Sequence, residues 1–239
     1  MGAPIMIRFW GQSKFSVEPL SPISYEFFLR EKDGDSWVLP QNFSQFPPSQ
    51  IADLLLKTVP AIQKNFKEIS INLDPEQFID QGFCQALHAI KAQLQPIILS
   101  VELTEHPATP MISNQQILAA AKNFYHAGIH LIVDDVGFGD NQIERVRMLN
   151  PCVHEYKFAI QNFRSMHNMD QVIPALNFWN HEANIHHKLF TVEGIENRDD
   201  LKMLINYHVD MLQGFGLGHP VYLPTISERH ANSVLPFKI

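Results

Sequence analysis

Residues 129–139 read Ile-His-Leu-Ile-Val-Asp-Asp-Val-Gly-Phe-Gly, an apolar run that ends in two adjacent carboxylates. Short apolar runs are typical of parallel strands that are buried on both faces. We therefore predict a strand over 129–135, with Asp134 and Asp135 at its carboxyl end. Adjacent carboxylates are unfavourable there unless a cation lies beside them. Taken alone, the pair is more typical of a solvated acidic turn.

Strand-like and helix-like segments alternate on both sides of this stretch. We predict further strands at 8–10, 21–30, 69–73, 97–103, 153–160, 188–193 and from 211 onward. Helical spacing predicts helices from a cap at Ser49 to Val59, within 76–94, at 113–128, 141–149 and 172–179, around 201–205 and at 225–234. We also predict a helix break near Pro60 and a turn at 33–35. This alternation implies parallel βαβ units. About eight strands in a chain of this length predict an α/β fold of the (β/α)8 barrel, or TIM, type.

The composition indicates one globular domain over 1–239. The chain shows no repeat, no low-complexity segment and no linker, and no apolar run is long enough to span a membrane. Its net charge of −7 makes long nucleic acid a poor partner, although bound divalent cations could still attract a phosphate. No signal peptide is visible, and Cys84 and Cys152 are typical of reduced thiols in a cytoplasmic protein.

Several predicted strands end in a carboxylate, an amide or a lysine. Because the chemistry of such barrels lies at the carboxyl ends of the strands, these side chains should converge. They are Glu26, Asn72, Glu102, Asp134, Asp135, Lys157, Glu193 and Gln213. Hard oxygen ligands with one lysine indicate a Mg²⁺ or Mn²⁺ site.

Each of these residues also has an ordinary interpretation. Lys157 alone could be a surface lysine, and Gln213, an amide before a glycine, could be structural. Glu105 is nearly as consistent with a solvated charge at the rim. The histidines at 181, 186 and 187 lie in a polar segment between a helix and a strand, which predicts a solvated surface rather than a second metal site.

The motifs, taken in order, resemble those of the EAL-domain family of cyclic di-GMP phosphodiesterases over about residues 6–221. Tyr-Glu-Phe-Phe-Leu-Arg at 25–30 resembles the Glu-Ala-Leu signature with its following Arg, and Ile-Asn-Leu at 71–73 resembles Asn-Leu-Ser. Val-Glu-Leu-Thr-Glu at 101–105 resembles Glu-x-Thr-Glu, and 134–139 resembles Asp-Asp-Phe-Gly-Thr-Gly. Lys157 corresponds to the lysine of Lys-x-Asp, Val-Glu-Gly-Ile-Glu at 192–196 resembles Glu-Gly-Val-Glu, and 213–215 resembles Gln-Gly-aromatic.

The resemblance implies a modified (β/α)8 barrel with a two-metal site that linearises cyclic di-GMP to 5′-pGpG in bacterial second-messenger signalling. By position, Glu26, Asn72, Glu102, Asp134 and Asp135 would bind the metals. Lys157, Glu193 and Gln213 would position the attacking water, and Arg30 and Gln12 would contact the substrate. Glu105 would support the loop after the Asp-Asp pair, which in the family couples dimer contacts to the metals, so a homodimer is expected. Since the resemblance uses nearly all of the chain, no attached sensory or cyclase region is expected.

Four positions depart from the family pattern. Phe27 and Phe28 replace the Ala and Leu of the signature, Ala159 replaces the aspartate of Lys-x-Asp, and Phe138 replaces a threonine in the Asp-Asp loop. These changes motivate the alternative of a catalytically weak or inactive receptor, or of a protein-interaction module, on the same barrel. Hydrolysis of another phosphodiester is a third possibility.

Overall fold

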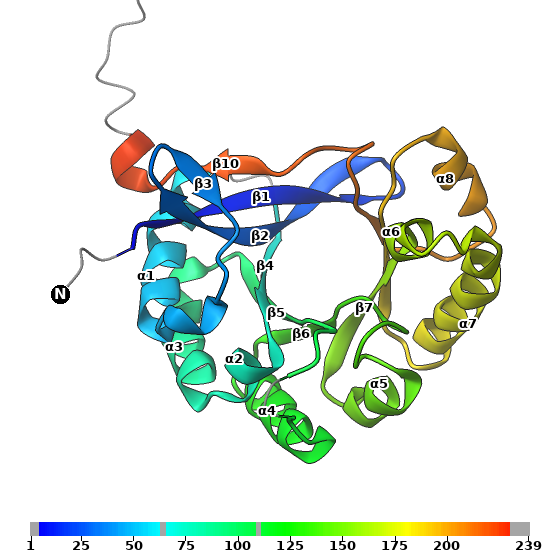
Figure 1. The fold of residues 1–239 in the computed structure, drawn as a ribbon, viewed down its shortest axis with the longest axis horizontal. Coiled ribbons are helices and arrows are strands. Elements are labelled where there is room, and N and C mark those ends of the chain that lie inside the picture. The colour runs from blue at the N-terminus through cyan, green and yellow to red at the C-terminus, as the bar shows by residue number, and fades with distance from the viewer. Residues whose placement is uncertain (1–4, 63–65, 109–110, 230–239) are drawn as a thin grey trace, which may run out of the picture.

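The chain forms a closed ring of strands surrounded by helices (Figure 1). The structure is a computed structural model that describes residues 5–62, 66–108 and 111–229. The ring consists of β1 (Ile7–Ser16), β2 (Ser21–Asp33), β4 (Glu68–Leu73), β5 (Ile98–Leu103), β6 (His130–Val133), β7 (Val153–Ala159), β8 (Leu189–Glu193) and β9 (Met211–Leu212). Two short strands, β3 (Ser36–Val38) and β10 (Val221–Leu223), pair outside it with β2 and β1. The predicted α/β barrel is confirmed.

The first strand runs against the others. β1 pairs antiparallel with β2 and with β9, whereas the pairs from β2 through β9 are parallel. The expectation of parallel units throughout is therefore wrong at this point. Only residues 17–20 connect β1 to β2, and a parallel pair requires a crossover of a dozen or more residues. The short strand predicted at 8–10 is in fact the first part of a ten-residue strand.

The helices lie outside the ring, and none separates β1 from β2 (Figure 1). They are α1 (Pro48–Thr58), α2 (Pro75–Ile79), α3 (Gln81–Lys91), α4 (Asn114–His126), α5 (Ile143–Leu149), α6 (Ile160–Ser165), α7 (Val172–Ile185) and α8 (Arg198–Met203). Ser113, the first residue of the helix predicted at 113–128, is the N-cap of α4, and a 3-10 turn over Val59–Ala61 confirms the break near Pro60.

Several predicted bounds need correction. Pro47, not Ser49, holds the N-cap position of α1. The helix expected within 76–94 is divided because Asp80 ends α2 and its side chain caps α3 through the N–H of Gly82. α7 continues to Ile185, so His181 lies on a helix rather than a loop. Helix α6 was not predicted. Of the helix predicted at 225–234, residues 226–229 are helical, Thr225 precedes them outside the helix, and 230–234 lie outside the described residues.

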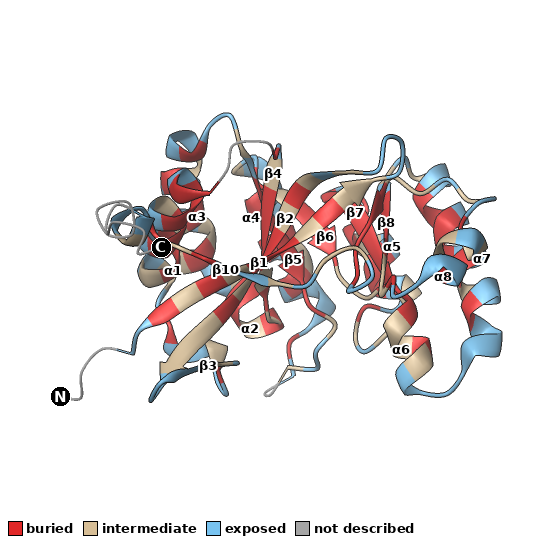
Figure 2. Ribbon diagram, turned by 90° about the horizontal axis from the view of Figure 1, so that it is seen from above, coloured by how far each residue is buried: buried red, intermediate tan, exposed pale blue. Residues whose placement is uncertain are grey.

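The apolar core lies between the ring and the helices, and the outer faces of the helices are exposed (Figure 2). In α4, for example, Ile117, Ala121 and Phe124 are buried at helical spacing against the ring. Across the described residues no helix has the length and apolar character needed to span a membrane. Cys84 and Cys152 are free thiols; Cys152 is buried, whereas Cys84 is only partly buried.

Candidate active site

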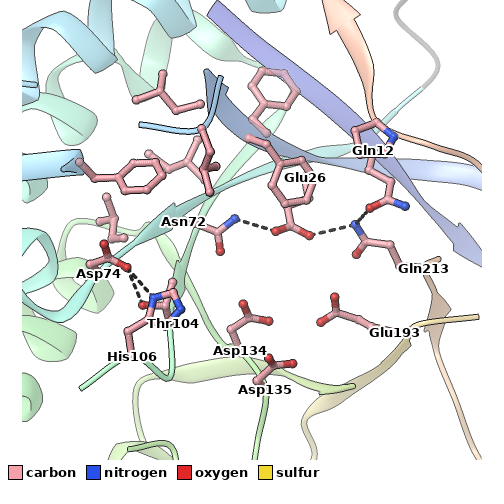
Figure 3. Close-up of a pocket in the computed structure, with 18 of the residues that line it drawn as sticks. Gln12, Glu26, Asn72, Asp74, Thr104, His106, Asp134, Asp135, Glu193 and Gln213 are labelled. Atoms are coloured by element: carbon pink, nitrogen blue, oxygen red, sulfur yellow. Dashed lines mark hydrogen bonds and ion pairs between the residues drawn. The ribbon is translucent and has the colours of Figure 1, made fainter. Parts of the chain in front are cut away.

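A cavity of about 500 Å³ opens at the carboxyl ends of the parallel strands. This volume lies in the range of small-molecule sites. All but two of the predicted site residues line it, namely Gln12, Glu26, Arg30, Asn72, Glu105, Asp134, Asp135, Glu193 and Gln213. Figure 3 labels all of these except Arg30 and Glu105. The other two, Glu102 and Lys157, are fully buried directly beneath. Side chains from eight strands and their loops thus converge as the barrel prediction required.

The Asp-Asp pair lies in a turn just after β6, rather than within the strand as predicted. Asp135 adopts a left-handed conformation with φ of 46°, which Asp tolerates better than most residues. The side-chain amide of Asn141 donates to the carbonyls of Asp134 (2.7 Å) and Leu103 (3.0 Å) and so holds the turn against β5. Burial, together with the charge of Asp134, raises the pKa of Asp135 to about 7.

Glu105 supports this loop through its main chain. Its carbonyl accepts a hydrogen bond from the Asp140 N–H at 2.8 Å. A Cβ at Gly139, where φ is +45°, would lie 2.1 Å from that carbonyl oxygen, so the close approach requires glycine. The Glu105 side chain instead lies near His106, with 3.5 Å between the Glu105 Oε1 and His106 Nε2 atoms.

One oxygen from each of Asp134, Asp135 and Glu193 lies within 4.8 Å of the other two. Asp134 Oδ1 and Glu193 Oε1 are buried and, in the part of the chain that the structure describes, accept no hydrogen bond, although Lys157 Nζ lies 3.1 Å from each. Buried carboxylate oxygens with unused acceptor capacity fit a divalent cation. The geometry therefore groups Glu193 with the Asp pair, whereas the sequence assigned it to the attacking water.

Lys157 is the electrostatic centre of the site. In addition to Asp134 and Glu193, its ammonium lies 3.0 Å from Glu26 Oε2 and also contacts Glu102. Burial alone would lower the pKa of Lys157, but these four carboxylates raise it well above its ordinary value. The side chain is therefore a buried cation, and the surface-lysine interpretation is wrong.

Glu26 is held by three donors. Asn72 Nδ2 donates to its Oε1 at 2.6 Å, and Lys157 and Gln213 donate to its Oε2 (Figure 3). Gln213 in turn donates to Gln12 at 3.3 Å. Burial and the Glu102 charge raise the pKa of Glu26. Glu26 lies mid-strand, not at the end of β2 as predicted, because β2 pairs with β4 only over Ser24–Phe27 and then continues to Asp33.

Glu102 lies under Lys157 and does not line the cavity. Ser70 and Lys157 donate to its two oxygens, Oε1 and Oε2 respectively. Burial would raise its pKa, but Lys157 and Lys14 lower it below the ordinary value. Glu102 is thus an ionised carboxylate, fixed between buried donors.

Among the cavity residues that were not predicted, three form a hydrogen-bonded group. Asp74 Oδ1 accepts hydrogen bonds from the Thr104 hydroxyl at 2.9 Å and from His106 at 3.1 Å (Figure 3). All three follow the carboxyl ends of β4 and β5. The expectation that polar residues at the carboxyl ends of strands form the site would have included them, had it been applied to the residues that follow each strand.

The fold and the cavity together define the chain as a (β/α)8-type barrel protein with an acidic candidate active site. The sequence profile of the EAL domain matches residues 9–220, and the chain belongs to this family.

Curated relatives agree with this assignment. The biofilm architecture maintenance protein MbaA of Vibrio cholerae is 26% identical over 226 residues, which cover 90% of this chain and 26% of MbaA. The cyclic di-GMP phosphodiesterase PdeF of Escherichia coli is 24% identical over 221 residues, 90% of this chain and 27% of PdeF. The chain thus spans about a quarter of the length of each.

A solved structure shows the same fold. The Bacillus subtilis YkuI protein, with an EAL domain, in complex with substrate c-di-GMP and calcium, superposes with a TM-score of 0.72 at 18% identity. The match covers 95% of this chain and 59% of YkuI.

Proposed function

We propose that this chain is a metal-dependent phosphodiesterase that hydrolyses cyclic di-GMP to linear 5′-pGpG. The observation that carries the proposal is the buried Lys157 ammonium, enclosed by Glu26, Glu102, Asp134 and Glu193 at the base of the cavity. PdeF is named a cyclic di-GMP phosphodiesterase, and YkuI binds c-di-GMP with calcium, which supports the choice of substrate.

Oxygen donors favour Mg²⁺ or Mn²⁺ as the cofactor, in a two-metal site. In this proposal Glu26, Asn72, Glu102, Asp134 and Asp135 hold the ions, and Glu193 lies close enough to join them. When bound, such ions lower the pKa of a water and stabilise charge that develops on a phosphate.

The remaining residues orient the reactants. As a charged donor, Lys157 can hydrogen-bond the attacking oxygen but cannot accept its proton, so its role is to orient and to stabilise negative charge. Glu193 Oε1, which accepts no hydrogen bond from the described residues, can accept one from the attacking water. Gln213, held against Glu26, completes the positioning of that water.

Arg30 and Gln12 are the proposed substrate contacts. The Arg30 guanidinium lines the cavity and, among the described residues, donates only to the carbonyl of Leu29 and forms no ion pair. Its planar fork therefore remains available for a phosphate, a geometry that lysine would not reproduce. Gln12 lies on the neighbouring strand β1, where its side chain is hydrogen-bonded to Gln213 and to the carbonyl of Gly218.

The direct test is turnover of cyclic di-GMP by the purified chain with Mg²⁺ or Mn²⁺, with 5′-pGpG measured by chromatography. The matched control is Glu26→Gln, which preserves side-chain shape and removes the charge. We expect the variant to lose about 100-fold or more in rate, the size of effect seen when a preorganised electrostatic contact is removed. Equal rates for the two proteins, or no product from either, would refute the proposal.

The alternative is a receptor or interaction module on the same barrel. The observation behind this alternative is Ala159, which places a buried methyl group at the end of β7, opposite Glu193. The EAL-domain pattern has an aspartate at this position. It predicts that calorimetry finds tight binding of cyclic di-GMP while chromatography recovers the ligand intact. A third candidate, another phosphodiester substrate, is addressed by a substrate panel in the same assay.

Homodimer formation, a cytoplasmic location and a single domain over 1–239 stay predictions. Sedimentation of the purified chain tests the first, fractionation of its host cell the second, and limited proteolysis the third.

A further inference from the structure

A second layer of polar side chains fills the barrel beneath the cavity. It consists of residues two positions from a site residue on the same strand, and such residues share one face. They are Lys14, Ser24, Ser70, Ser100, Glu155 and Thr191, all of them buried. Barrel interiors of this type are normally filled by branched aliphatic side chains. Here the layer contains hydroxyls and one ion pair, Lys14–Glu155.

Lys14 lies between two carboxylates. Its Nζ atom is 3.1 Å from Glu155 Oε1 and 3.6 Å from Glu102 Oε1, and the side chain is completely buried. Thr191 also donates to Glu155 at 2.6 Å. A buried ammonium requires such partners, since its desolvation is strongly unfavourable without them. Glu155 therefore forms an ion pair with Lys14 on one side, and the Lys14 ammonium places its positive charge beside Glu102 on the other.

The contact with Glu102 determines how that carboxylate is oriented. Its Oε1 atom faces Ser70 and Lys14 in the lower layer, and its Oε2 atom faces Lys157. Without Lys14, Lys157 would be the one cation among the described residues that forms ion pairs with Glu26, Glu102, Asp134 and Glu193. Glu102 would then keep a single neutral donor on its Oε1 side.

We propose that Lys14 is a positioning residue, whose ammonium holds the Oε1 edge of Glu102 from below and so keeps the Oε2 edge turned toward Lys157 and the carboxylates above it. This inference rests on the proposed function, because it takes Glu102 to be a metal ligand. Partners that orient a metal ligand from outside the coordination sphere contribute about 10–100-fold to metal affinity.

The test is calorimetric titration of Mn²⁺ into the full chain and into Lys14→Met, Lys14→Met/Glu155→Gln and Glu155→Gln. The double variant guards against misfolding, because removing both members of a buried pair is far less destabilising than removing one. We expect both variants that lack Lys14 to bind Mn²⁺ about 10–100-fold more weakly. Glu155→Gln retains the Lys14–Glu102 contact and should remain within about threefold of the unmodified chain.

Turnover gives a second readout. For the variants without Lys14, the Mn²⁺ concentration required for half-maximal rate should rise, while KM for the nucleotide at saturating Mn²⁺ should stay unchanged. If Lys14 only stabilised the fold, its loss would not raise the Mn²⁺ requirement while leaving KM for the nucleotide unchanged.

Each other outcome is informative. Unchanged Mn²⁺ affinity in a folded Lys14 variant, or equal weakening by Glu155→Gln, would overturn the inference and leave the proposed function intact. A double variant that fails to fold would overturn it as well, because Lys14 would then be a folding residue. Absence of Mn²⁺ binding by the unmodified chain would instead refute the metal site on which the proposed function depends.

Discussion

Phe27 and Phe28, adjacent residues that depart from the family signature, have different environments. Phe27 is 1% exposed, and its ring centroid lies 5.2 Å from that of Phe9. Both residues line the cavity, but Phe28 is only half-buried and shares the strand face of Glu26, which Phe27 does not. We expect Phe27→Ala to reduce the free energy of unfolding by about 3 kcal/mol or more. Phe28→Ala should change it by less than about 1 kcal/mol and raise KM for the nucleotide instead.

Urea unfolding and steady-state kinetics on the two variants check this contrast. The pair serves as its own control, since both changes remove the same atoms from adjacent positions. If Phe28→Ala proved as destabilising as Phe27→Ala and left KM unchanged, the assignment of Phe28 to the cavity wall would be wrong.

Single residues also show what the sequence could reveal about the site. Glu26, Asn72 and Asp134 were found because a polar side chain in or after an apolar strand requires a partner. Lys14 and Glu155 follow the same logic, since each lies two positions from a site residue, but they were not recognised. The number of residues between Lys157 and the carboxylates could not show that the lysine lies beneath them. Their relative position depends on the tilt of the strands in the barrel and on the register between distant strands.

At the scale of elements, Glu228 links the helical turn after β10 to β1. Its carboxylate accepts hydrogen bonds from the Arg8 guanidinium at 2.9 Å and from the Thr225 N–H at 2.7 Å. Burial would raise the pKa of Glu228, but Arg8, Thr225 and Tyr222 lower it to about 2. A carboxyl group whose folded pKa is depressed stabilises the fold above its unfolded pKa, about 4.3, and this contribution is lost as the pH falls toward 2.

We therefore expect Glu228→Gln to lower the free energy of unfolding by about 1 kcal/mol at pH 7, a value reduced for solvent screening of a carboxylate that is one-third exposed. The difference in unfolding free energy between Glu228→Gln and the unmodified chain should decrease as the pH falls from 5 to 2, as measured by urea titration. Lys202→Gln is the control, because the Lys202–Asp199 pair is largely exposed and should contribute less than about 0.5 kcal/mol at any pH. A deficit independent of pH would contradict the role of the charge.

The elements themselves were predicted with unequal success. Apolar strands such as β5 and capped helices such as α4 follow from local pattern, and Ser113 was found at its cap. β10 and α6 were missed because they are short and show no clear periodicity. β10 is defined by its pairing with β1, and α6 by its packing against β8. The reversed direction of β1 could have been inferred even from the predicted strands at 8–10 and 21–30, because the segment 11–20 between them is shorter than the dozen residues that a crossover requires.

At the scale of the whole molecule, the barrel gathers carboxylates that repel one another in a chain of net charge −7. A cation bound by the folded state alone stabilises it by about 2.7 kcal/mol at 100 times its dissociation constant. For a chain of this size, that corresponds to a rise in Tm of roughly 5–10 °C. We therefore expect Mg²⁺ or Mn²⁺ to raise Tm by this amount relative to EDTA, measured by circular dichroism without nucleotide.

Asp135→Asn is the discriminating variant for that measurement. Asparagine tolerates the left-handed backbone at position 135, where φ is 46°, so the turn after β6 should persist. The substitution also removes a charge from beside Asp134, so Tm in EDTA should not fall. Because one of the three grouped carboxylates is lost, the rise in Tm on adding metal should shrink to less than half. An equal rise in both proteins would place the stabilising ion away from the Asp-Asp turn, and the two-metal proposal would fail there.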